Sequence, residues 1–420
     1  MKVVWLVDFP LPTLAKELGL ASQASGSWVS ALLHALLTQP TRLPLPEMTI
    51  LCSVTGLDKP QCVQIDGVQY RALPRTNGKA MLAQALDEIK PDLVQLFGTE
   101  SEQALWLFEL FDARRILVYI QGLAGPCGDH MTDGLPEHFL HHQPMKEFLS
   151  RHTGGLTVLQ QKELLLCRGE REKAILTQAR QVLGRTDWDR RYCTKLSPWI
   201  RYHTLNEIMR PSFYSGSWNR NECQQHRIFV SQGNLPLKGL HRAIAALPWL
   251  CSQWPDTQLY VAGWAPPNKG ALLQPFMNWL VEYSGYLEKL ARHLGVWEHI
   301  HYTGVLNESE MYQQMLLAET FLMPSSIENS PNSLGEAMLM GLPSVASAVG
   351  GIPSVMSDVE GVLFDPDRPG ALEQAIARLW QDPQAADHRA RFARERALVD
   401  HDPARIANQQ LEIYEQLSRL

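Results

Sequence analysis

The chain has 420 residues, of which 45% are hydrophobic and 20% are charged, and its net charge is −6. This composition excludes a disordered chain and a collagen-like repeat, and the length suits two or three domains. The acidic balance excludes a global basic field, so we expect no nucleic-acid partner. The seven cysteines are scattered without a C-x-x-C pair, which predicts neither a zinc site nor a disulfide framework.

Short apolar runs alternate with longer amphipathic stretches through the first half of the chain. Val3–Val7, Asp92–Phe97 and Ile116–Ile120 predict buried strands, and Ser27–Leu37 has the apolar spacing of a helix. Such alternation is typical of a parallel sheet that is covered by helices on both faces. The first run is too short for a signal peptide, and no run approaches the ~18 apolar residues of a membrane span. We therefore expect a cytoplasmic protein.

An arginine-rich stretch follows at Glu163–Arg191. Its seven basic residues are interleaved with five acidic ones, which is typical of a solvated helix face. The sharper interpretation is a peripheral contact with the inner face of a membrane, which would suit a lipid-linked substrate. The sequence leaves both interpretations open.

The chain loses both the helical and the strand periodicity near residues 211–226, which are rich in Ser, Gly, Asn and Gln. A strand-like run restarts at Arg227–Ser231, and further runs follow it (259–262, 299–302, 320–323 and 344–347). We predict two doubly wound α/β domains, 1–212 and 213–400, and a C-terminal helix in 401–420 that packs back on the first domain. Open sheets of this kind bind ligands at the carboxyl ends of their strands.

Two glutamates in the second half have the most informative spacing. Glu328 and Glu336 cannot share one helix, because the residues between them have turn chemistry. We predict Glu328 on a loop and Glu336 in the first turns of a helix that is capped near Asn332 or Ser333 and ends at Gly341. The free N–H groups of the first turn would form an anion site that suits a diphosphate. On spacing alone, two solvated surface glutamates beside a simple cap are the alternative.

The glutamate pair, with E-A-M at its second member and G-L-P-S-V-A-S after it, resembles the retaining nucleotide-sugar glycosyltransferases of the GT4 type, also called glycosyl transferases group 1. The resemblance covers most of residues 227–370 and includes L-Y-V-A-G at 259–263 and P-L-K-G at 236–239. It implies the GT-B fold, in which two facing Rossmann-like doubly wound domains enclose an interdomain cleft. Residues 1–212 would then be the acceptor side, and residues 213–400 would hold the nucleotide-sugar donor. It also implies that no metal and no cofactor takes part.

The resemblance implies a role for each matched residue. Lys238 and Glu328 would be the catalytic residues, because the lysine neutralises the donor diphosphate and the glutamate holds the hydroxyls of the donor sugar. Glu336 would bind the ribose of the nucleotide. Further donor contacts are expected at Pro331, Asn332, Ser333, Gly263, Val305, Gly26 and Gln121.

Two positions depart from the family pattern. Gly233 stands where the family commonly has an arginine, so one cation and polar groups would hold the diphosphate. Gln121 stands where many relatives have a histidine, so its role would be hydrogen bonding and not proton transfer. For Gly26, a simple turn that caps the first helix is the alternative to a loop that closes on the donor phosphates.

The function that the resemblance implies is transfer of a hexose from a nucleoside-diphosphate sugar to a hydroxyl acceptor, with retention at the anomeric carbon and without a metal. The acceptor would be a carbohydrate, a lipid-linked glycan or a small molecule, in cell-surface polysaccharide or glycoconjugate synthesis. Three alternatives stay open. They are a nucleotide-sugar epimerase or hydrolase of the same fold, a degenerate subunit that binds nucleotide sugars without turnover, and an adaptor that recruits partners through Glu163–Arg191.

Overall fold

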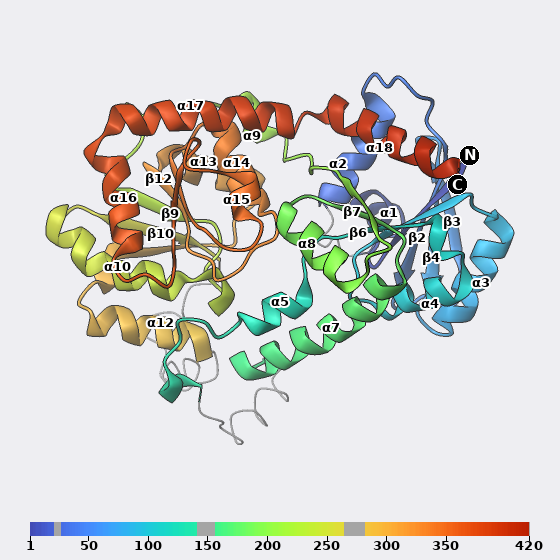
Figure 1. The fold of residues 1–420 in the computed structure, drawn as a ribbon, viewed down its shortest axis with the longest axis horizontal. Helices are drawn as coiled ribbons and strands as arrows, with labels where there is room; N and C mark the ends of the chain where they lie inside the picture. Colours follow the sequence, from blue (N-terminus) through green and yellow to red (C-terminus); the bar gives the residue numbers. More distant parts are fainter. Residues whose placement is uncertain (21–26, 141–155, 264–281, 420) are drawn as a thin grey trace. The chain divides into compact units, whose positions relative to one another are not determined.

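The computed structural model describes residues 1–20, 27–140, 156–263 and 282–419 (Figure 1). The chain folds into two compact α/β units. Unit 1 comprises Met1–Ala124, Arg168–Arg210 and Asp400–Leu420, and unit 2 comprises Gly125–Cys167 and Pro211–Val399. The predicted first domain, residues 1–212, differs from unit 1 because Gly125–Cys167 packs with unit 2.

The described residues of unit 1 form an eight-stranded sheet with the order β3-β4-β2-β1-β5-β6-β7-β8. The β3–β4 pair is antiparallel and the other pairs are parallel. The strand order reverses between β1 and β5, because β2 and β4 extend the sheet on one side of β1 and β5 to β8 extend it on the other. The strands are β1 (Lys2–Val7), β2 (Glu47–Val54), β3 (Gln61–Ile65), β4 (Val68–Pro74), β5 (Leu93–Phe97), β6 (Ile116–Tyr119), β7 (Gln181–Gly184) and β8 (Arg201–Thr204).

Helices separate most of the consecutive strands of this sheet along the chain, as in other parallel α/β units. Every residue of β5, β6 and β7 is buried, as central parallel strands require. The strands predicted at Val3–Val7, Asp92–Phe97 and Ile116–Ile120 and the helix predicted at Ser27–Leu37 are confirmed. The helices are α1 (Pro12–Glu17), α2 (Ser27–Thr38), α3 (Gly78–Ile89), α4 (Glu102–Leu110), α8 (Asp187–Leu196) and α18 (Pro403–Ser418), while α5 (Ala124–Asp129) and α7 (Val158–Gln178) carry the chain across the boundary between the units.

Helix α18 is part of unit 1 and packs against α2 (Figure 1). Tyr414 of this helix is fully buried. Its hydroxyl accepts a hydrogen bond from Trp5 Nε1 at 2.7 Å and donates one to Gln95 Oε1 at 2.5 Å. The last helix of the chain therefore joins the core beside β1 and β5.

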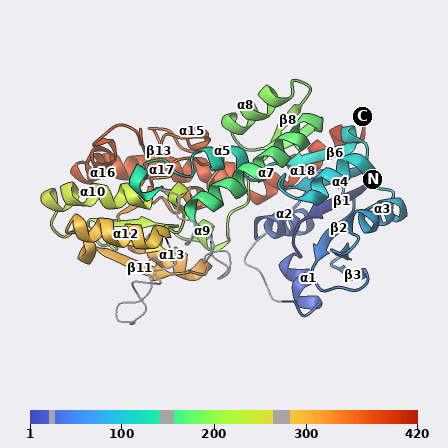
Figure 2. The same cartoon turned by 90° about the horizontal axis from the view of Figure 1, so that it is seen from below.

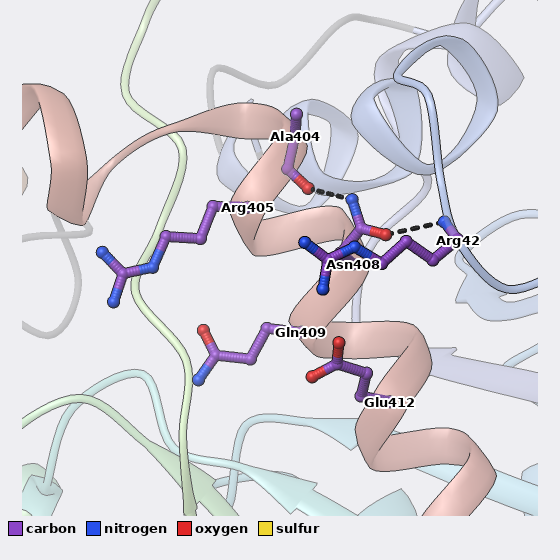
Figure 3. Close-up of a pocket in the computed structure, with 6 residues that line it drawn as sticks. All are labelled: Arg42, Ala404, Arg405, Asn408, Gln409 and Glu412. Atoms are coloured by element: carbon purple, nitrogen blue, oxygen red, sulfur yellow. Dashed lines mark hydrogen bonds between the residues drawn. The ribbon is translucent and has the colours of Figure 1, made fainter.

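An asparagine near the beginning of α18 holds the segment that precedes β2. Asn408 Oδ1 accepts a hydrogen bond from the Arg42 N–H at 2.8 Å, and Nδ2 donates to the Ala404 carbonyl at 2.7 Å (Figure 3). A cavity of about 420 Å³ lies at this junction. The Asn408 amide is hydrogen-bonded to main-chain groups and is not available to a ligand. We therefore assign this cavity a structural role and no binding role.

The described residues of unit 2 form a six-stranded parallel sheet with the order β11-β10-β9-β12-β13-β14 (Figures 1 and 2). Here the strand order reverses between β9 and β12. The five strands predicted in this half are confirmed as β9 to β13, with small shifts at their ends, and the structure adds a sixth strand, β14. The six strands are β9 (Arg227–Val230), β10 (Gln258–Ala262), β11 (Ile300–Gly304), β12 (Thr320–Met323), β13 (Ser344–Ser347) and β14 (Val362–Phe364). The helices are α9 (Ser212–Ser215), α10 (Leu240–Gln253), α12 (Glu282–His293), α13 (Glu308–Leu317), α14 (Asn332–Met340), α15 (Ile352–Val355), α16 (Ala371–Gln381) and α17 (Pro383–Asp400).

Two glycines of Gly125–Cys167 lie too close to their neighbours to carry a side chain, and one of them contacts the rest of unit 2. A Cβ on Gly128 would lie 2.9 Å from the side chain of Leu166 on α7. A Cβ on Gly134, whose φ is +75°, would lie 2.7 Å from Nε2 of His241 on α10. Both close approaches need the absence of a side chain. The contact at Gly128 holds the segment to itself, and the contact at Gly134 joins it to α10 of unit 2.

The buried imidazole of His241 should make the stability of unit 2 depend on pH. Burial, with a smaller effect of the nearby Arg242 guanidinium, lowers the pKa of His241 from 6.5 to about 4. Between these values the unfolded chain binds a proton that the folded chain does not. The stabilisation is therefore complete above pH 6.5 and decreases as the pH falls toward 4, and we expect a loss of about 2 kcal/mol between pH 6.5 and pH 5.

Urea unfolding of the full chain at each pH measures this loss. The His241→Gln variant should lose about 2 kcal/mol less than the wild type over the same interval. The matched control is His388→Gln, which changes an exposed histidine of α17 and should leave the pH profile unchanged. Equal profiles for wild type and His241→Gln would contradict the prediction.

Candidate functional site

The loops after β9 and β12 lie at the point where the strand order of unit 2 reverses. In open α/β sheets, ligands bind at such a point, at the carboxyl ends of the strands. The loop after β9 leads through a short 3₁₀ helix, η3 (Pro236–Lys238), into α10, and the loop after β12 leads into α14. Lys238 lies on the first loop and Glu328 lies on the second. The two predicted catalytic residues are thus placed together at this edge of the sheet.

The side chains of Lys238 and Glu328 contact each other directly. Lys238 Nζ lies 2.6 Å from Glu328 Oε1, and the Ser325 hydroxyl donates to the same oxygen at 2.9 Å. The lysine and glutamate side chains are 22% and 11% exposed, so bulk water screens the pair only in part. A charge-assisted hydrogen bond of this kind is stronger than a neutral one. It holds an ammonium group, which suits an anionic ligand, beside a carboxylate, which suits ligand hydroxyls.

A close approach of the two loops fixes this pair. Gly239 has a φ of +70°, and a Cβ on it would lie 1.8 Å from the Pro324 carbonyl oxygen. The Ser326 N–H donates to the Leu237 carbonyl at 2.8 Å. The left-handed backbone and the contact both require glycine at this position. The glycine of P-L-K-G therefore brings Lys238 against the second loop.

The loop between β13 and α15 holds the main chain of Glu328 from another side. The Gly351 N–H donates to the Glu328 carbonyl at 2.9 Å. A Cβ on Gly350, whose φ is +53°, would lie 2.1 Å from the same carbonyl oxygen. The two glycines of V-A-S-A-V-G-G thus position the loop that carries Glu328.

Helix α14 starts one residue earlier than a cap at Asn332 or Ser333 would require. Pro331 is the N-cap residue and makes no side-chain capping bond. The N–H groups of Leu334 and Gly335 both donate to the Pro331 carbonyl, at 3.1 and 3.3 Å. The N–H groups of the first two residues therefore have no acceptor within the helix, which makes this end attractive to an anion.

The predicted placement of Glu328 on a loop and Glu336 in α14 is confirmed, and Gly341 ends the helix with a φ of +71°. Glu336 is 3% exposed, and the Glu328 side chain is 11% exposed. Burial excludes the alternative of two solvated surface glutamates. The Asn332 Oδ1 atom is also buried, without a hydrogen-bond partner in the described part of the chain.

Gly263 and Val305 lie at the carboxyl ends of the neighbouring strands β10 and β11. A Cβ on Gly263, whose φ is +116°, would lie 2.5 Å from Asn234 Oδ1 on the loop that carries Lys238. The Gly263 N–H donates to the Gly304 carbonyl at 2.8 Å. The Val305 side chain is 69% exposed. The structure therefore brings Gly263 against the first loop and leaves Val305 open to solvent.

The remaining two predicted contacts belong to the first half of the chain. Gly26 lies outside the described residues. Gln121 follows β6 in unit 1, where its carbonyl accepts a hydrogen bond from the Arg185 guanidinium. Arg185 Nη1 lies 2.6 Å from Glu207 Oε1, and both side chains are 4% exposed. A buried ion pair thus fixes the main chain at Gln121.

Gly233 has no room for a side chain. A Cβ on it would lie 2.6 Å from a methyl group of Leu240 and 2.6 Å from one of Val261. An arginine at this position would have to displace both of these buried residues. The departure from the family pattern at Gly233 therefore has a steric cause.

Two polar residues beside the Lys238–Glu328 pair were not identified from the sequence. Ser325 binds the Glu328 carboxylate, and Arg242 donates to the Pro366 carbonyl at 2.6 Å and to Ser326 Oγ at 3.4 Å. The positions of both residues in the sequence could have indicated them. Ser325 is a small polar residue two positions after a buried strand, and Arg242 follows Lys238 by about one helical turn.

Several charges of Glu163–Arg191 are paired within their own unit. Arg168 contacts Glu100 at 3.0 Å, and Arg185 is buried with Glu207. None of the helices in the described ranges is both long and apolar enough to cross a membrane. Contact of this stretch with a membrane surface stays a prediction.

The two Rossmann-like α/β units confirm the predicted doubly wound domains and define the class of the fold, which is the GT-B type found in glycosyltransferases. Sucrose-phosphate synthase from Thermosynechococcus elongatus matches with a TM-score of 0.70 at 18% identity, over 99% of both chains. HepE from Anabaena, in complex with UDP-glucose, matches with a TM-score of 0.63 at 16% identity, over 100% of both chains. At these identities the likeness shows the fold.

Residues 217–396, which lie in unit 2, match the family model described as Glycosyl transferases group 1. Glycogen synthase from Mycobacterium tuberculosis is 31% identical over 178 residues, which are 42% of this chain and 39% of that protein. The chain thus spans about two fifths of the length of the curated relatives that it matches.

Proposed function

We propose that the chain is a retaining, metal-independent glycosyltransferase that moves a hexose from a nucleoside-diphosphate sugar to a hydroxyl acceptor. The observation that carries the proposal is the 2.6 Å contact between Lys238 and Glu328, on the two loops at the strand reversal of a group 1 domain. The similarity to glycogen synthase and the UDP-glucose complex of HepE support nucleotide-sugar chemistry.

Negative charge develops on the diphosphate as its bond to the sugar breaks. Lys238 and the first-turn N–H groups of α14 stabilise that charge, as preorganised donors do in an oxyanion site. Glu328, held by Lys238 and Ser325, accepts hydrogen bonds from the sugar hydroxyls, and Glu336 accepts them from the ribose. The acceptor oxygen bonds to the anomeric carbon on the face from which the diphosphate departs, and its proton passes to the departing phosphate oxygen. Attack on that face retains the anomeric configuration.

Replacing Glu336 with alanine should weaken donor binding by about 100-fold, because hydrogen bonds of a charged carboxylate to the ribose contribute about 1.5–3 kcal/mol each. The measurement is isothermal titration with the nucleotide sugar that binds the wild type. The matched control is Glu395→Ala, which changes an exposed glutamate of α17 and should bind as the wild type does. Circular dichroism and the melting temperature of the free Glu336→Ala chain separate lost binding from lost folding. Wild-type affinity in a folded Glu336→Ala chain would show that the ribose is bound elsewhere.

The requirement for an acceptor separates this proposal from the other candidates. A transferase releases the nucleoside diphosphate only when an acceptor is present, whereas a hydrolase releases it without one. An epimerase changes the sugar and releases no nucleotide, and a non-catalytic subunit binds the donor without any change. The enzyme is incubated with the nucleotide sugar, with and without an extract that contains acceptors. The nucleoside diphosphate released and the identity of the remaining sugar then distinguish these outcomes.

We place the reaction in cell-surface polysaccharide or glycoconjugate synthesis, in the cytoplasm, with a carbohydrate or lipid-linked acceptor. Glu163–Arg191 would then contact the inner face of the membrane. Flotation of the full chain with anionic vesicles tests this contact, and absence of flotation at low salt would contradict it.

A further inference from the structure

A cavity of about 480 Å³ opens at the carboxyl edge of the sheet of unit 1. Two residues that line it, Asp8 and Glu100, lie on the segments that follow β1 and β5. The strand order of this sheet reverses between these two strands. The cavity therefore lies where open α/β sheets bind ligands, and its volume suits a molecule of about the size of one substituted sugar ring.

Three arginines line this cavity. Arg168 and Arg171 lie about one turn apart on α7, where Arg168 Nη1 donates to Glu100 Oε2 at 3.0 Å and Arg171 Nη1 donates to the Glu100 carbonyl at 2.7 Å. Arg75, directly after β4, is exposed, and its guanidinium has no hydrogen-bond partner within the described residues. Two guanidinium groups are thus held in place from one side, and a third is available to a ligand.

Carboxylates that line the cavity balance part of this charge. Glu100 is paired with Arg168, and Glu102 is exposed at the beginning of α4. Burial raises the pKa of Asp8, against the opposing effects of a hydrogen bond from Ser101 and the charge of Arg75. Arg171 is hydrogen-bonded to a neutral carbonyl, and the Arg75 guanidinium is not hydrogen-bonded to a carboxylate within the described residues. The positive charges of these two arginines are therefore not neutralised by a hydrogen-bonded acid and can attract an anionic ligand.

The other walls suit the uncharged part of a polyol. Ser53, near the end of β2, is 4% exposed, and it lines the cavity together with Asp8, so the wall includes a hydroxyl and a carboxyl. Trp106 of α4 adds an aromatic wall, of the kind that packs on the apolar face of a ring. The cavity thus combines a cationic end with a hydroxyl-binding end.

We propose that this cavity binds a phosphorylated polyol as the acceptor, with the phosphate at Arg75, Arg168 and Arg171 and ring hydroxyls at Asp8 and Ser53. The assignment of the ligand as acceptor rests on the proposed function. Arginine suits this task because its planar fork binds two phosphate oxygens at once. A free sugar phosphate and a phosphorylated lipid headgroup present the same chemistry.

The test uses the full chain and two probes, glucose 6-phosphate in solution and vesicles that contain phosphatidylglycerol. We expect at least one probe to bind, glucose and phosphatidylcholine vesicles to bind much more weakly, and Arg75→Gln to weaken binding by about tenfold. Arg168→Gln, which changes a half-exposed side chain, should do the same. The matched control is Arg114→Gln, an exposed arginine before β6 at the opposite edge of the sheet, which should leave binding unchanged.

The two probes distinguish the two sources of phosphate. Binding of glucose 6-phosphate assigns a soluble acceptor, and binding of the anionic vesicles alone assigns a lipid headgroup. Failure of both probes, or equal binding by Arg75→Gln, Arg168→Gln and Arg114→Gln, would overturn the proposal. Nucleotide-sugar binding to the same preparations is measured separately, so a chain that binds the donor but neither probe loses only this inference. A chain that binds a probe but no donor loses the proposed function instead.

Discussion

Replacing Lys238 with methionine should lower kcat by about 100- to 1,000-fold, which is typical for the loss of one preorganised donor at a site of developing charge. The substitution removes the ammonium group that lies 2.6 Å from Glu328 Oε1 and keeps a side chain of similar length. Glu328 keeps its hydrogen bond from the Ser325 hydroxyl at 2.9 Å, so the second loop retains an anchor. Steady-state kinetics with the donor that supports turnover measure the effect.

The control for this substitution is Lys289→Met, which changes an exposed lysine of α12 in the same unit. It should leave kcat unchanged. If the Lys238→Met enzyme retained kcat within about threefold of the wild type, its ΔG‡ would have changed by less than about 1 kcal/mol. Stabilisation of the leaving group could then not be assigned to Lys238.

Replacing Gly239 with alanine should lower the free energy of unfolding by about 2–5 kcal/mol. A φ of +70° costs a non-glycine residue about 1–2 kcal/mol, and the new methyl group would lie 1.8 Å from the Pro324 carbonyl oxygen. Forcing an atom into a filled space adds about 1–3 kcal/mol. Since the displaced loop carries Ser325 and Glu328, activity should fall with stability. Urea unfolding of the full chain measures the change.

Gly295→Ala is a matched control that separates the two costs. Gly295 has a φ of +71°, but a Cβ on it would have no heavy atom within 4 Å. This variant should lose only the backbone cost of about 1–2 kcal/mol. Equal losses in the two variants would mean that the close contact of Gly239 with the second loop contributes nothing to stability.

Three strands of unit 1 and five strands of unit 2 could be predicted because buried parallel strands are short apolar runs, which a sequence displays directly. The packing of Gly125–Cys167 with unit 2 could not be predicted, because it involves contacts such as that of Gly134 with His241, a residue far along the chain. Glycine carries no periodicity, so only the neighbours show why a side chain is excluded. For the same reason, the sequence could not show why glycine replaces the family's arginine at position 233, where Leu240 and Val261 leave no room for a side chain.

The parts of the site that depend on neighbouring residues in the sequence could be predicted. Turn residues between Glu328 and Glu336 forced the pair onto a loop and a helix, and the structure has that arrangement. The beginning of α14 was misplaced by one residue because Pro331 takes the N-cap position without a side-chain capping bond. Ser325 and Arg242 were missed because their importance comes from the contact between two loops that are distant in sequence.

The central claim is that unit 2 binds a nucleoside-diphosphate sugar. Thermal unfolding of the full chain with a panel of UDP-, GDP- and ADP-sugars tests it most directly, because a ligand that binds the folded state raises Tm by mass action. We expect at least one donor to raise Tm in proportion to the logarithm of its concentration, with a gain in stability of about 2.7 kcal/mol at 100 times its Kd. The rise should be lost in Glu336→Ala and retained in Glu395→Ala. No rise with any donor at millimolar concentration would contradict the claim.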